Sequence, residues 1–514
     1  MEGTHRQFSV GFSMSAQKHE GSKVQITIIL GIFLALLAGE LAGGGRDDEQ
    51  LRWLSYLNGP QAAALMAGVI FLMWSLMRVV SGRVVAKLKG TELPQPAALR
   101  LPGRVDFLMR MAVLGAFAVQ LVGGWAHLIC GRWRLQRFVL ADEILLILPF
   151  LVLVIMQWYC FYPVNRYMRE YVITGQLAEG LSARPVWRRS QYVSFHVRGG
   201  MLIILVPLLL MLTWKDLVDW AVGRWFPASA SAWWPWVITA AGAGAIFILA
   251  PLLLRLIWLT RTLPSGPLRV RLEAFCERMR LKYRDILLWD TYSAVANAAV
   301  MGLWRPVRYV LLSDALIENL SDEQIEAVFG HEAGHVRHHH IVFLVLFVLG
   351  GGLIVMLLTE LLALALSAFF NEHELWGTVE EWLVYGWSLG LLAGWMLVFG
   401  WVSRRFERQA DVHAAQVIGL GEEEASVRAG RLSARGARIM GSALLRIAVL
   451  NGISTEARSW RHSSIASRAE FLRQLAEQKG ALARFMRLVL VTKIMILAAV
   501  AVGGGFLLVG LLAD

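Results

Sequence analysis

Residues 321–366 read SDEQIEAVFGHEAGHVRHHHIVFLVLFVLGGGLIVMLLTELLALAL and join the two signals that decide the fold. The first half is polar with helical periodicity. Ser321 and Gln324 form a capping-box pattern at its start, and Leu320 is placed to pack on Ile325. The second half is almost wholly apolar and exceeds the ~20 residues that a helix needs to cross a bilayer. The sequence therefore predicts a polar helix that continues, or nearly continues, into a membrane span.

The polar helix carries the motif His331-Glu332-Ala333-Gly334-His335. Positions i and i+4 share one face of a helix, so both imidazoles can bind one metal ion while Glu332 handles a water molecule beside it. The alternative is a pair of histidines on a polar face without a metal. The capped helix and the preceding strand pattern, in a chain with only 12 histidines, favour the metal site.

A catalytic zinc usually has three protein ligands and a water, so a third ligand is expected downstream. Residues 403–411 read SRRFERQAD and place Glu407 and Asp411 at helical positions i and i+4. Glu407 would complete a site of two histidines and a glutamate, and Asp411 would accept the free N–H of a zinc-bound histidine. Without the upstream motif, both carboxylates would be interpreted as partners of neighbouring arginines.

Composition places the chain in a membrane. Of its 514 residues, 57% are hydrophobic and 17% are charged, against about 45–50% and 25% in soluble domains. The net charge of +12 is assigned to Lys and Arg beside membrane spans, so no nucleic-acid partner is expected. The three cysteines form neither a disulfide framework nor a CxxC metal pair.

Nine apolar stretches are long enough to be membrane spans. They lie at about 24–42, 61–80, 107–130, 144–162, 199–214, 233–258, 341–366, 382–402 and 485–512. The fifth is short and contains Pro207. The first is expected to be a retained helix rather than a cleaved signal peptide. Short loops on one side carry twice as many Lys and Arg residues as those on the other, which predicts a cytoplasmic N-terminus in a cell (inner) membrane.

The two longest polar stretches, 259–340 and 403–484, then lie on the cytoplasmic side and are interpreted as one split domain. Residues 268–282 have helical periodicity, and short strands are expected at 284–288, 296–301 and 307–312. The predicted organisation is a membrane region of about six helices at 1–258, a domain at 259–484 interrupted by spans at 341–366 and 382–402, and a final span at 485–514.

Several stretches resemble a known family. They are Asn297-Ala298 followed by Gly302, RYVLLSDALIENLS at 308–321, HEAGHVRHHH at 331–340, SRRFERQAD at 403–411, and SWRH at 459–462 followed by Arg468. Together they resemble the membrane gluzincin peptidases that include HtpX and the CAAX prenyl endoprotease type I, over roughly residues 265–475 apart from the two spans. The last match departs from the family pattern, because Ser463 stands where a proline is usual.

The resemblance implies one Zn²⁺ per chain, held by His331, His335 and Glu407, with Glu332 as the catalytic carboxylate. It also implies that Asn297 and His462 approach the substrate or the developing oxyanion, which the N–H donors of both side chains suit. The alternatives are a hydrogen-bonded loop asparagine and a surface histidine. His338, His339 and His340 are interpreted as marking the water interface.

The fold class expected from these features is mainly α: a polytopic helical membrane protein with a split, cytoplasmic, zincin-like α+β metalloprotease domain. The expected activity is zinc-dependent hydrolysis of peptide bonds in membrane or membrane-associated proteins. An intramembrane protease of the site-2 type would need an Asp-Gly motif after HExxH, and none occurs. A transporter or scaffold with a vestigial protease domain, and a CAAX-type processing enzyme rather than a quality-control protease, remain alternatives.

Overall fold

The computed structural model describes residues 15–43, 57, 59–90, 96–178, 186–227, 233–293, 295–370, 376–419, 431–451, 454–456 and 463–513. The helices are α1 Ser15–Gly43, α2 Gly59–Lys89, α3 Pro96–Gln120, η2 Leu121–Trp125, η3 His127–Arg132, η4 Leu135–Arg137, α4 Ala141–Ala178, α5 Arg189–His196, η5 Val197–Leu202, α6 Ile203–Trp225, α7 Trp234–Ile257, α8 Pro267–Arg278, η7 Arg305–Val307, α9 Asp314–Asn319, α10 Asp322–Arg337, α11 His340–Phe370, α12 Trp376–Ile418, α14 Ala434–Leu450, α15 Ile465–Glu477 and α16 Ala481–Ala513. The strands are β1 Thr260–Thr262, β2 Asp285–Trp289, β3 Ala298–Met301 and β4 Tyr309–Ser313.

Within the described residues, nine helical segments are long and apolar enough to cross a membrane. They are Gln25–Ala42, Gly59–Lys89, Leu101–Arg132, Ala141–Tyr171, Arg189–Trp225, Trp234–Ile257, His340–Leu366, Gly386–Ile418 and Ala481–Val509. Each overlaps one predicted span. Their outer surfaces carry large exposed apolar side chains, such as Leu397 at 76% exposure, as a lipid-facing surface requires. The prediction of a polytopic helical membrane protein is therefore confirmed.

The fifth span is longer than the sequence predicts. It runs from Arg189 to Trp225 as one segment, because α5 passes through the π-helical turn η5 into α6. Pro207 lies inside α6 and does not end it. A proline removes one backbone donor and usually kinks a helix without ending it when the flanking turns are apolar and packed. The apolar pattern near Pro207 therefore underestimates the length of the helix.

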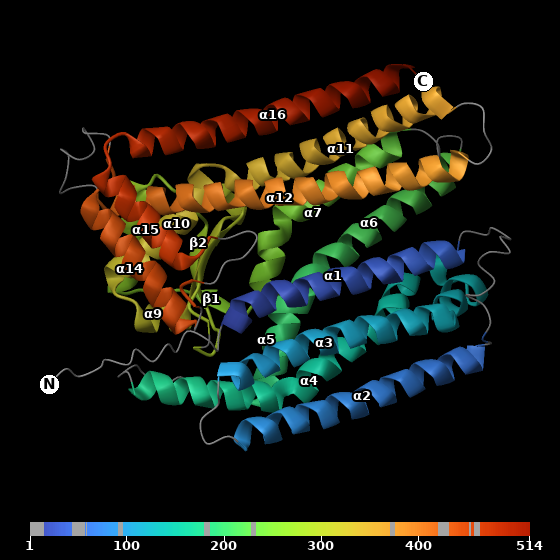
Figure 1. Cartoon of the computed structure of the whole chain (residues 1–514), viewed down its shortest axis with the longest axis horizontal. Helices are drawn as coiled ribbons and strands as arrows, with labels where there is room; N and C mark the ends of the chain where they lie inside the picture. The colour runs from blue at the N-terminus through green and yellow to red at the C-terminus, as the bar shows by residue number, and fades with distance from the viewer. Residues whose placement is uncertain are drawn as a thin grey trace.

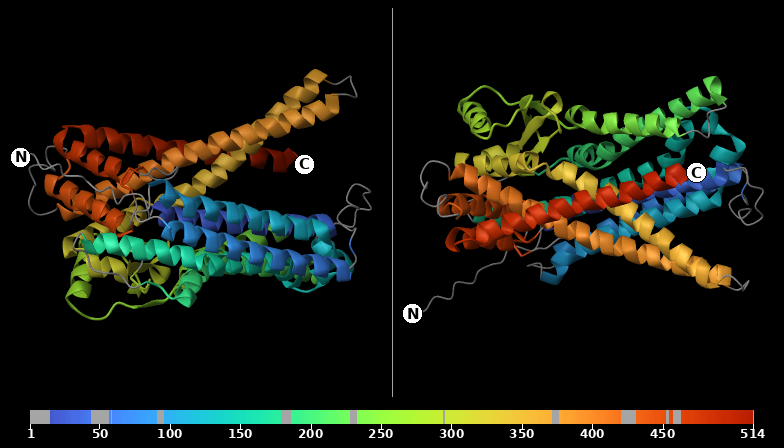
Figure 2. Two further views of the ribbon diagram at one scale, coloured as in Figure 1. Left: turned by 60° about the horizontal axis from the view of Figure 1, so that its bottom comes forward. Right: turned by 90° about the horizontal axis from the view of Figure 1, so that it is seen from above.

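Figure 1 shows how the spans are grouped. Helices α1 to α4 run side by side, α11, α12 and α16 form a second group, and α6 and α7 pack against each other. Figure 2 shows the same two groups from other directions, with α11 and α12 projecting together beyond their neighbours. The sheet, α10, α14 and α15 gather at one end of the helices. The polar part of the chain thus lies at one end of the bundle.

The sheet has four strands in the order β1-β2-β4-β3. Strands β2 and β4 pair in parallel, and β1 and β3 add antiparallel strands at the two edges. The three predicted strands are present, and β1, which is short and polar, was missed. All five residues of β4 are buried, so it forms the centre of the sheet, and β3 is left as an edge strand close to α10.

The helix that carries the HExxH motif begins as predicted. Ser321 Oγ accepts from Gln324 N–H, and Gln324 Oε1 accepts from Ser321 N–H, which completes the capping box. The helix ends at Arg337, and His339 takes the left-handed conformation with φ 54° before α11 begins at His340. The two helices are therefore nearly continuous, with a short break between them.

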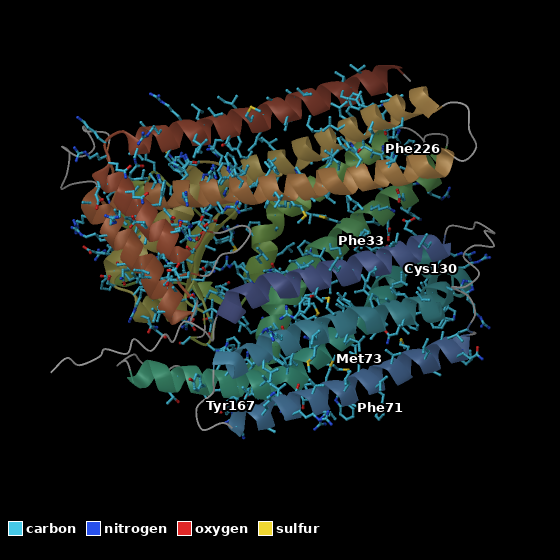
Figure 3. All side chains as sticks on the ribbon, in the orientation of Figure 1. Phe33, Phe71, Met73, Cys130, Tyr167 and Phe226 are labelled. Carbon is cyan, nitrogen blue, oxygen red and sulfur yellow. The ribbon has the colours of Figure 1, made fainter. Side chains whose placement is uncertain are left out.

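Buried apolar side chains form two large clusters. One extends from Ile28 to Met201 and joins the N-terminal helices; Met73 and Cys130, both labelled in Figure 3, belong to it. The other extends from Leu263 to Ile496 and joins the sheet to α8, α10, α12, α14, α15 and α16. The domain boundaries predicted at 258/259 and 484/485 stay predictions, and the first of them falls between α7 and β1.

Candidate metal centre

Two helices that meet without bulky side chains between them build the centre. A Cβ atom added to Gly334 of α10 would lie 3.0 Å from Ala410 Cα, and one added to Gly330 would lie 3.3 Å from Ala414 Cα. These contacts are at or near the limit for real Cβ atoms, so glycine on α10 and alanine on α12 permit the close approach. The approach brings His331 and His335 of α10 to face Glu407 of α12.

The three side chains place their donor atoms in a small triangle. His331 Nε2 and His335 Nε2 lie 3.3 Å apart, and they lie 3.7 Å and 3.8 Å from the two oxygens of Glu407. Among the described residues, these three form a group whose ligand atoms all lie within 4.8 Å of one another. Zn–N bonds of about 2.0–2.1 Å in a tetrahedron require donor separations of about 3.3–3.4 Å. The spacing and the donor set both fit zinc.

Asp411 lies directly behind the first ligand. It is fully buried, and its Oδ1 lies 2.8 Å from His331 Nδ1, at hydrogen-bond distance. Burial alone would lower the pKa of His331, but the hydrogen bond and the charge of Asp411 outweigh it and raise that pKa. If Nδ1–H donates to Asp411, Nε2 keeps its lone pair directed at the metal position. This is the arrangement that the spacing of Glu407 and Asp411 predicts.

Arg468 of α15 completes this buried network. Its Nε donates to Asp411 Oδ2 at 2.8 Å and its Nη2 donates to Asp411 Oδ1 at 2.6 Å, while Nη1 lies 3.7 Å from Glu407 Oε2. Burial opposes the charged guanidinium, yet Asp411 and Glu407 raise its pKa overall. A bidentate pair of this kind fixes both partners. The sequence had indicated Arg468 only as part of a late motif, with no role assigned.

Replacing Arg468 with alanine is expected to destabilise the protein by about 3–5 kcal/mol, because it leaves the buried Asp411 carboxylate without its cation. Thermal unfolding of the purified protein in detergent measures the change. Arg473→Ala is the matched control on the same helix: Arg473 pairs with Glu470 and Glu477 in an exposed network, and its loss is expected to change the unfolding temperature little. Equal effects of the two substitutions would contradict the proposed network.

A second chain of contacts lies behind His335. Its Nδ1 lies 3.0 Å from His340 Nδ1, and His340 Nε2 lies 2.8 Å from Gln409 Oε1. A glutamine oxygen only accepts, so His340 carries its proton on Nε2 and accepts at Nδ1. His335 must then donate from Nδ1, which frees its Nε2 for a metal. Burial and the neighbouring His331 lower the pKa of His335 to about 4, which favours the neutral, metal-binding imidazole.

The interpretation of His340 as a marker of the water interface is wrong. Its side chain is fully buried, and its ring stacks on Phe406 with centroids 4.5 Å apart. His340 follows the left-handed residue His339, and its side chain lies between His335 of α10 and Gln409 of α12. The sequence offered one indication of this: His340 directly precedes an apolar span, and a buried imidazole needs hydrogen-bond partners.

His340→Phe is expected to weaken zinc binding by roughly 10–100-fold, the usual cost of losing a partner that orients a ligand. The variant keeps an aromatic ring against Phe406 but removes the acceptor for His335. Zinc affinity measured by competition with a chromogenic chelator gives the result. The control is His339→Asn, which changes an exposed histidine and suits the left-handed backbone there. Unchanged affinity in His340→Phe would show that the contact does not orient His335.

Three predicted site residues remain: Glu332, Asn297 and His462. Glu332 is half-buried on α10, between the first ligand and Ala333. Asn297 is held by its main chain, since its N–H donates to Ser313 Oγ at 2.9 Å and its carbonyl accepts from Ser313 N–H at 3.0 Å. These bonds place it directly before the edge strand β3. His462 lies outside the described residues, so its role stays a prediction.

Comparison with known proteins shows that part of this chain is similar to a known family. Residues 269–434 match the model of peptidase family M48. The protease HtpX homolog of Acidovorax ebreus is 26% identical over 151 residues, 29% of this chain and 51% of that protein. Protease HtpX of Haemophilus ducreyi is 27% identical over 196 residues, 37% of this chain and 66% of that protein. The matches thus cover about half to two thirds of these relatives.

A structural comparison matches 80% of this chain with 98% of Ste24p from S. mikatae, at 16% identity and a TM-score of 0.38. The matched family segment contains the motif helix, the following two spans and residues 403–411. It therefore includes all three side chains of the donor triangle and Asp411 behind them. The family model and the HtpX relatives thus confirm, over residues 269–434, the resemblance that the sequence motifs predict.

Proposed function

We propose that this protein is a membrane-embedded zinc metalloendopeptidase that cleaves peptide bonds of membrane or membrane-associated proteins. The observation that carries the proposal is the triangle of His331, His335 and Glu407, whose donor atoms lie 3.3–3.8 Å apart. Structural zinc sites usually have four protein ligands, whereas catalytic sites have three and leave one position open. A site of three ligands, with the Glu332 carboxylate directly after His331 in the sequence, fits the catalytic type.

A zinc ion bound here would supply Lewis-acid chemistry and lower the pKa of a bound water to about 7. Glu332 follows the first ligand on the helix and is the proposed general base, which takes the proton from the attacking water. It then returns that proton to the amine that leaves when the peptide bond breaks. Asp411 and His340 are proposed to hold the proton of each ring on Nδ1, which leaves the Nε2 atoms of His331 and His335 to bind the metal. The mechanism needs no nucleophilic serine or cysteine.

The edge strand beside the site suits an extended substrate. Strand β3 pairs with β4 on one side, and its other edge is free of a strand partner among the described residues. A peptide segment can add to such an edge through main-chain hydrogen bonds. Asn297 stands at the start of β3, where its side-chain amide is proposed to donate to the oxyanion that forms at the scissile carbonyl. His462 is proposed for the same task on the strength of the sequence motif.

A small cavity of about 50 Å³ lies next to the second ligand. It is bounded by Leu303 after β3, by Val336 of α10 and by Ile341 of α11. Because the cavity adjoins His335, we propose that it accepts a side chain of the substrate.

The proposed topology puts the N-terminus and the metal centre in the cytoplasm, in line with the excess of Lys and Arg in the loops on that side. Glu407 lies within the segment Gly386–Ile418, where α12 faces His331 of α10. We therefore propose that the site lies close to the membrane surface, where chains leaving the bilayer can reach it. We favour general or quality-control proteolysis of membrane proteins over processing of lipid-modified C-termini.

The test is cleavage of a quenched casein-derived peptide by the full chain in detergent, measured together with zinc content. We expect one zinc per chain, cleavage that a chelator stops, and recovery on adding zinc back. A chain that binds zinc without cleaving any peptide or membrane protein would support the alternative of a scaffold with a vestigial site. A chain that binds no zinc would overturn the proposal itself.

A further inference from the structure

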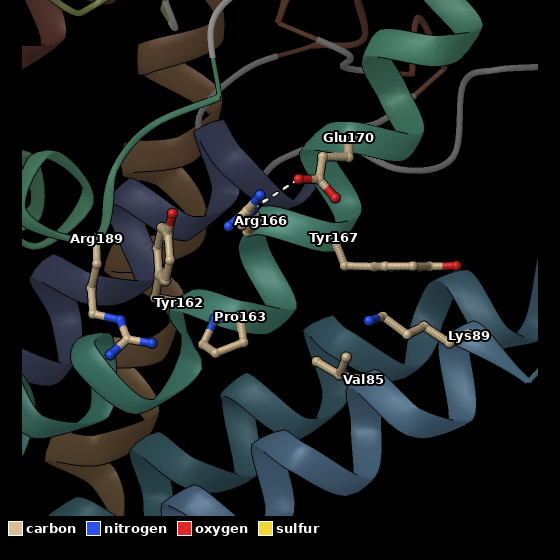
Figure 4. Close-up of a pocket in the computed structure, with 8 residues that line it drawn as sticks. All are labelled: Val85, Lys89, Tyr162, Pro163, Arg166, Tyr167, Glu170 and Arg189. Atoms are coloured by element: carbon tan, nitrogen blue, oxygen red, sulfur yellow. Dashed lines mark hydrogen bonds and ion pairs between the residues drawn. The ribbon is translucent and has the colours of Figure 1, made fainter.

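A groove between two N-terminal helices combines basic and aromatic side chains at the end of their spans. It runs between residues 78–89 of α2 and 159–170 of α4, and Arg189, the first residue of α5, closes one side. Two adjoining cavities of about 360 Å³ and 280 Å³ make up the groove and share Val85, Pro163 and Arg189. Figure 4 shows Arg189 and Lys89 on opposite sides of Pro163 and Val85. None of these residues belongs to the metal centre.

The groove has an excess of positive charge. Four cations line it: Arg78, Lys89, Arg166 and Arg189. Its one acidic side chain, Glu170, pairs with Arg166 at 2.8 Å, as the dashed line in Figure 4 marks. Within the described residues, no carboxylate forms an ion pair with the other three cations. An anion in the groove would therefore face about three unneutralised positive charges.

The walls are held in place before any ligand binds. Tyr162 donates its hydroxyl to Trp187 O at 2.7 Å, and Tyr167 donates to Leu88 O at 3.0 Å. The guanidinium of Arg189 lies over the rings of Tyr159 and Tyr162, 4.6 Å and 5.3 Å from their centroids. Rigid walls reduce the entropy that binding must overcome. The groove is thus preformed rather than an accidental gap between mobile side chains.

The groove changes from polar to apolar along α2. Positions 89, 85, 82, 78, 74 and 71 follow one another at helical spacing on one face of that helix. Lys89 stands at the end of the span Gly59–Lys89, while Trp74 and Phe71 lie inside it and are 37% and 65% exposed. A ligand that fills the whole face must therefore have a negatively charged head and an apolar tail.

We propose that this groove binds an anionic phospholipid, with the phosphate between Arg189 and Lys89 and an acyl chain along Trp74 and Phe71. Basic pockets between membrane helices on the cytoplasmic side bind such head groups. Gly82 supports the proposal, because a Cβ added there meets no atom within 4 Å and the floor of the groove is open at that point. The site lies at the same end of the bundle as α10, on the side proposed to be cytoplasmic.

The test uses the full chain, purified and delipidated in a non-ionic detergent. Native mass spectrometry would follow its titration with phosphatidylglycerol and with phosphatidylcholine of the same acyl chains. We expect tighter binding of phosphatidylglycerol. Removing Arg189 and Lys89 together, as Arg189→Gln and Lys89→Gln, is expected to weaken it by roughly 25-fold, at about 5-fold for each cation. Binding of phosphatidylcholine is expected to change less than 2-fold.

Two further variants separate the site from general surface charge and from misfolding. Arg83→Gln removes an exposed cation from α2 that does not line the groove, and we expect it to leave the lipid preference unchanged. Gly82→Leu keeps every charge but fills the open floor, and we expect it to abolish the preference. Equal binding of the two lipids, an equal loss in Arg83→Gln, or displacement of phosphatidylglycerol by millimolar inorganic phosphate at constant ionic strength would each overturn the proposal.

Discussion

Glu332→Gln is expected to lower peptide hydrolysis by on the order of 10²–10⁴-fold while leaving zinc bound. The amide has the size and helical preference of the carboxylate, so the ligands on either side of it in sequence should keep their positions. It cannot accept the proton of the attacking water, however, and loss of a positioned base costs this much in rate. Cleavage of a quenched peptide and zinc content, measured on the same preparation, check the result.

The matched control is Glu323→Gln on the same helix. Glu323 pairs with Arg435 at 2.8 Å near the start of α10, well away from the donor triangle. Its substitution should leave both zinc content and cleavage rate near those of the parent. Full activity in Glu332→Gln would sink the proposed mechanism, whereas loss of zinc together with activity would show that Glu332 holds the helix or the metal.

The residues of the candidate metal site could be predicted because their spacing depends on local helix geometry. The spacing of His331 and His335 places both on one helical face whatever the rest of the fold does. Glu407 and Asp411 follow the same rule on α12, and the chemistry of zinc limits which residue types complete the set. The spacing could not predict that the two helices touch. Their contact depends on the packing of Gly330 and Gly334 against alanines of α12.

The supporting residues could not be predicted, because each depends on the three-dimensional path of the chain. Arg468 reaches Asp411 across 57 positions in sequence, and only the packing of α15 brings them together. His340 is buried and the preceding His339 has a left-handed conformation, and a run of three histidines predicts neither feature. Gln409 lies between the two predicted carboxylates, but its amide carries no charge that would indicate a role in the sequence.

Apolar length predicted the spans better than it predicted their ends. Each of the nine stretches corresponds to a helix among the described residues, but several helices extend beyond the apolar part. The clearest case is α12, which runs without a break from Trp376 to Ile418 and joins a span to the helix that holds Glu407. Hydropathy detects only the apolar part of a helix that lies in the bilayer. The backbone hydrogen bonds of the helix can continue beyond it into water, so the helix can be longer than its apolar part.

Glu407→Ala is expected to weaken zinc binding by more than the 10–100-fold predicted for His340→Phe, because it removes a ligand rather than a group that orients one. At a zinc concentration of 100 times Kd, the parent protein gains about 2.7 kcal/mol of stability from the metal. A 100-fold rise in Kd would reduce that gain to about 0.4 kcal/mol. The difference in unfolding temperature with zinc and with chelator should therefore shrink in the variant.

Glu407→Gln provides the matched comparison, since it keeps an oxygen of nearly the same position but not the charge. We expect its zinc affinity to lie between those of Glu407→Ala and the parent, because a neutral amide is a weaker ligand than a carboxylate. The ranking of the three zinc affinities also distinguishes two roles of Glu407: a metal ligand, or a charge that only balances Arg468. If charge near Arg468 were all that mattered, the two variants would lose zinc equally. If neither lost it, the metal would lie elsewhere, and His331 and His335 would need another third ligand.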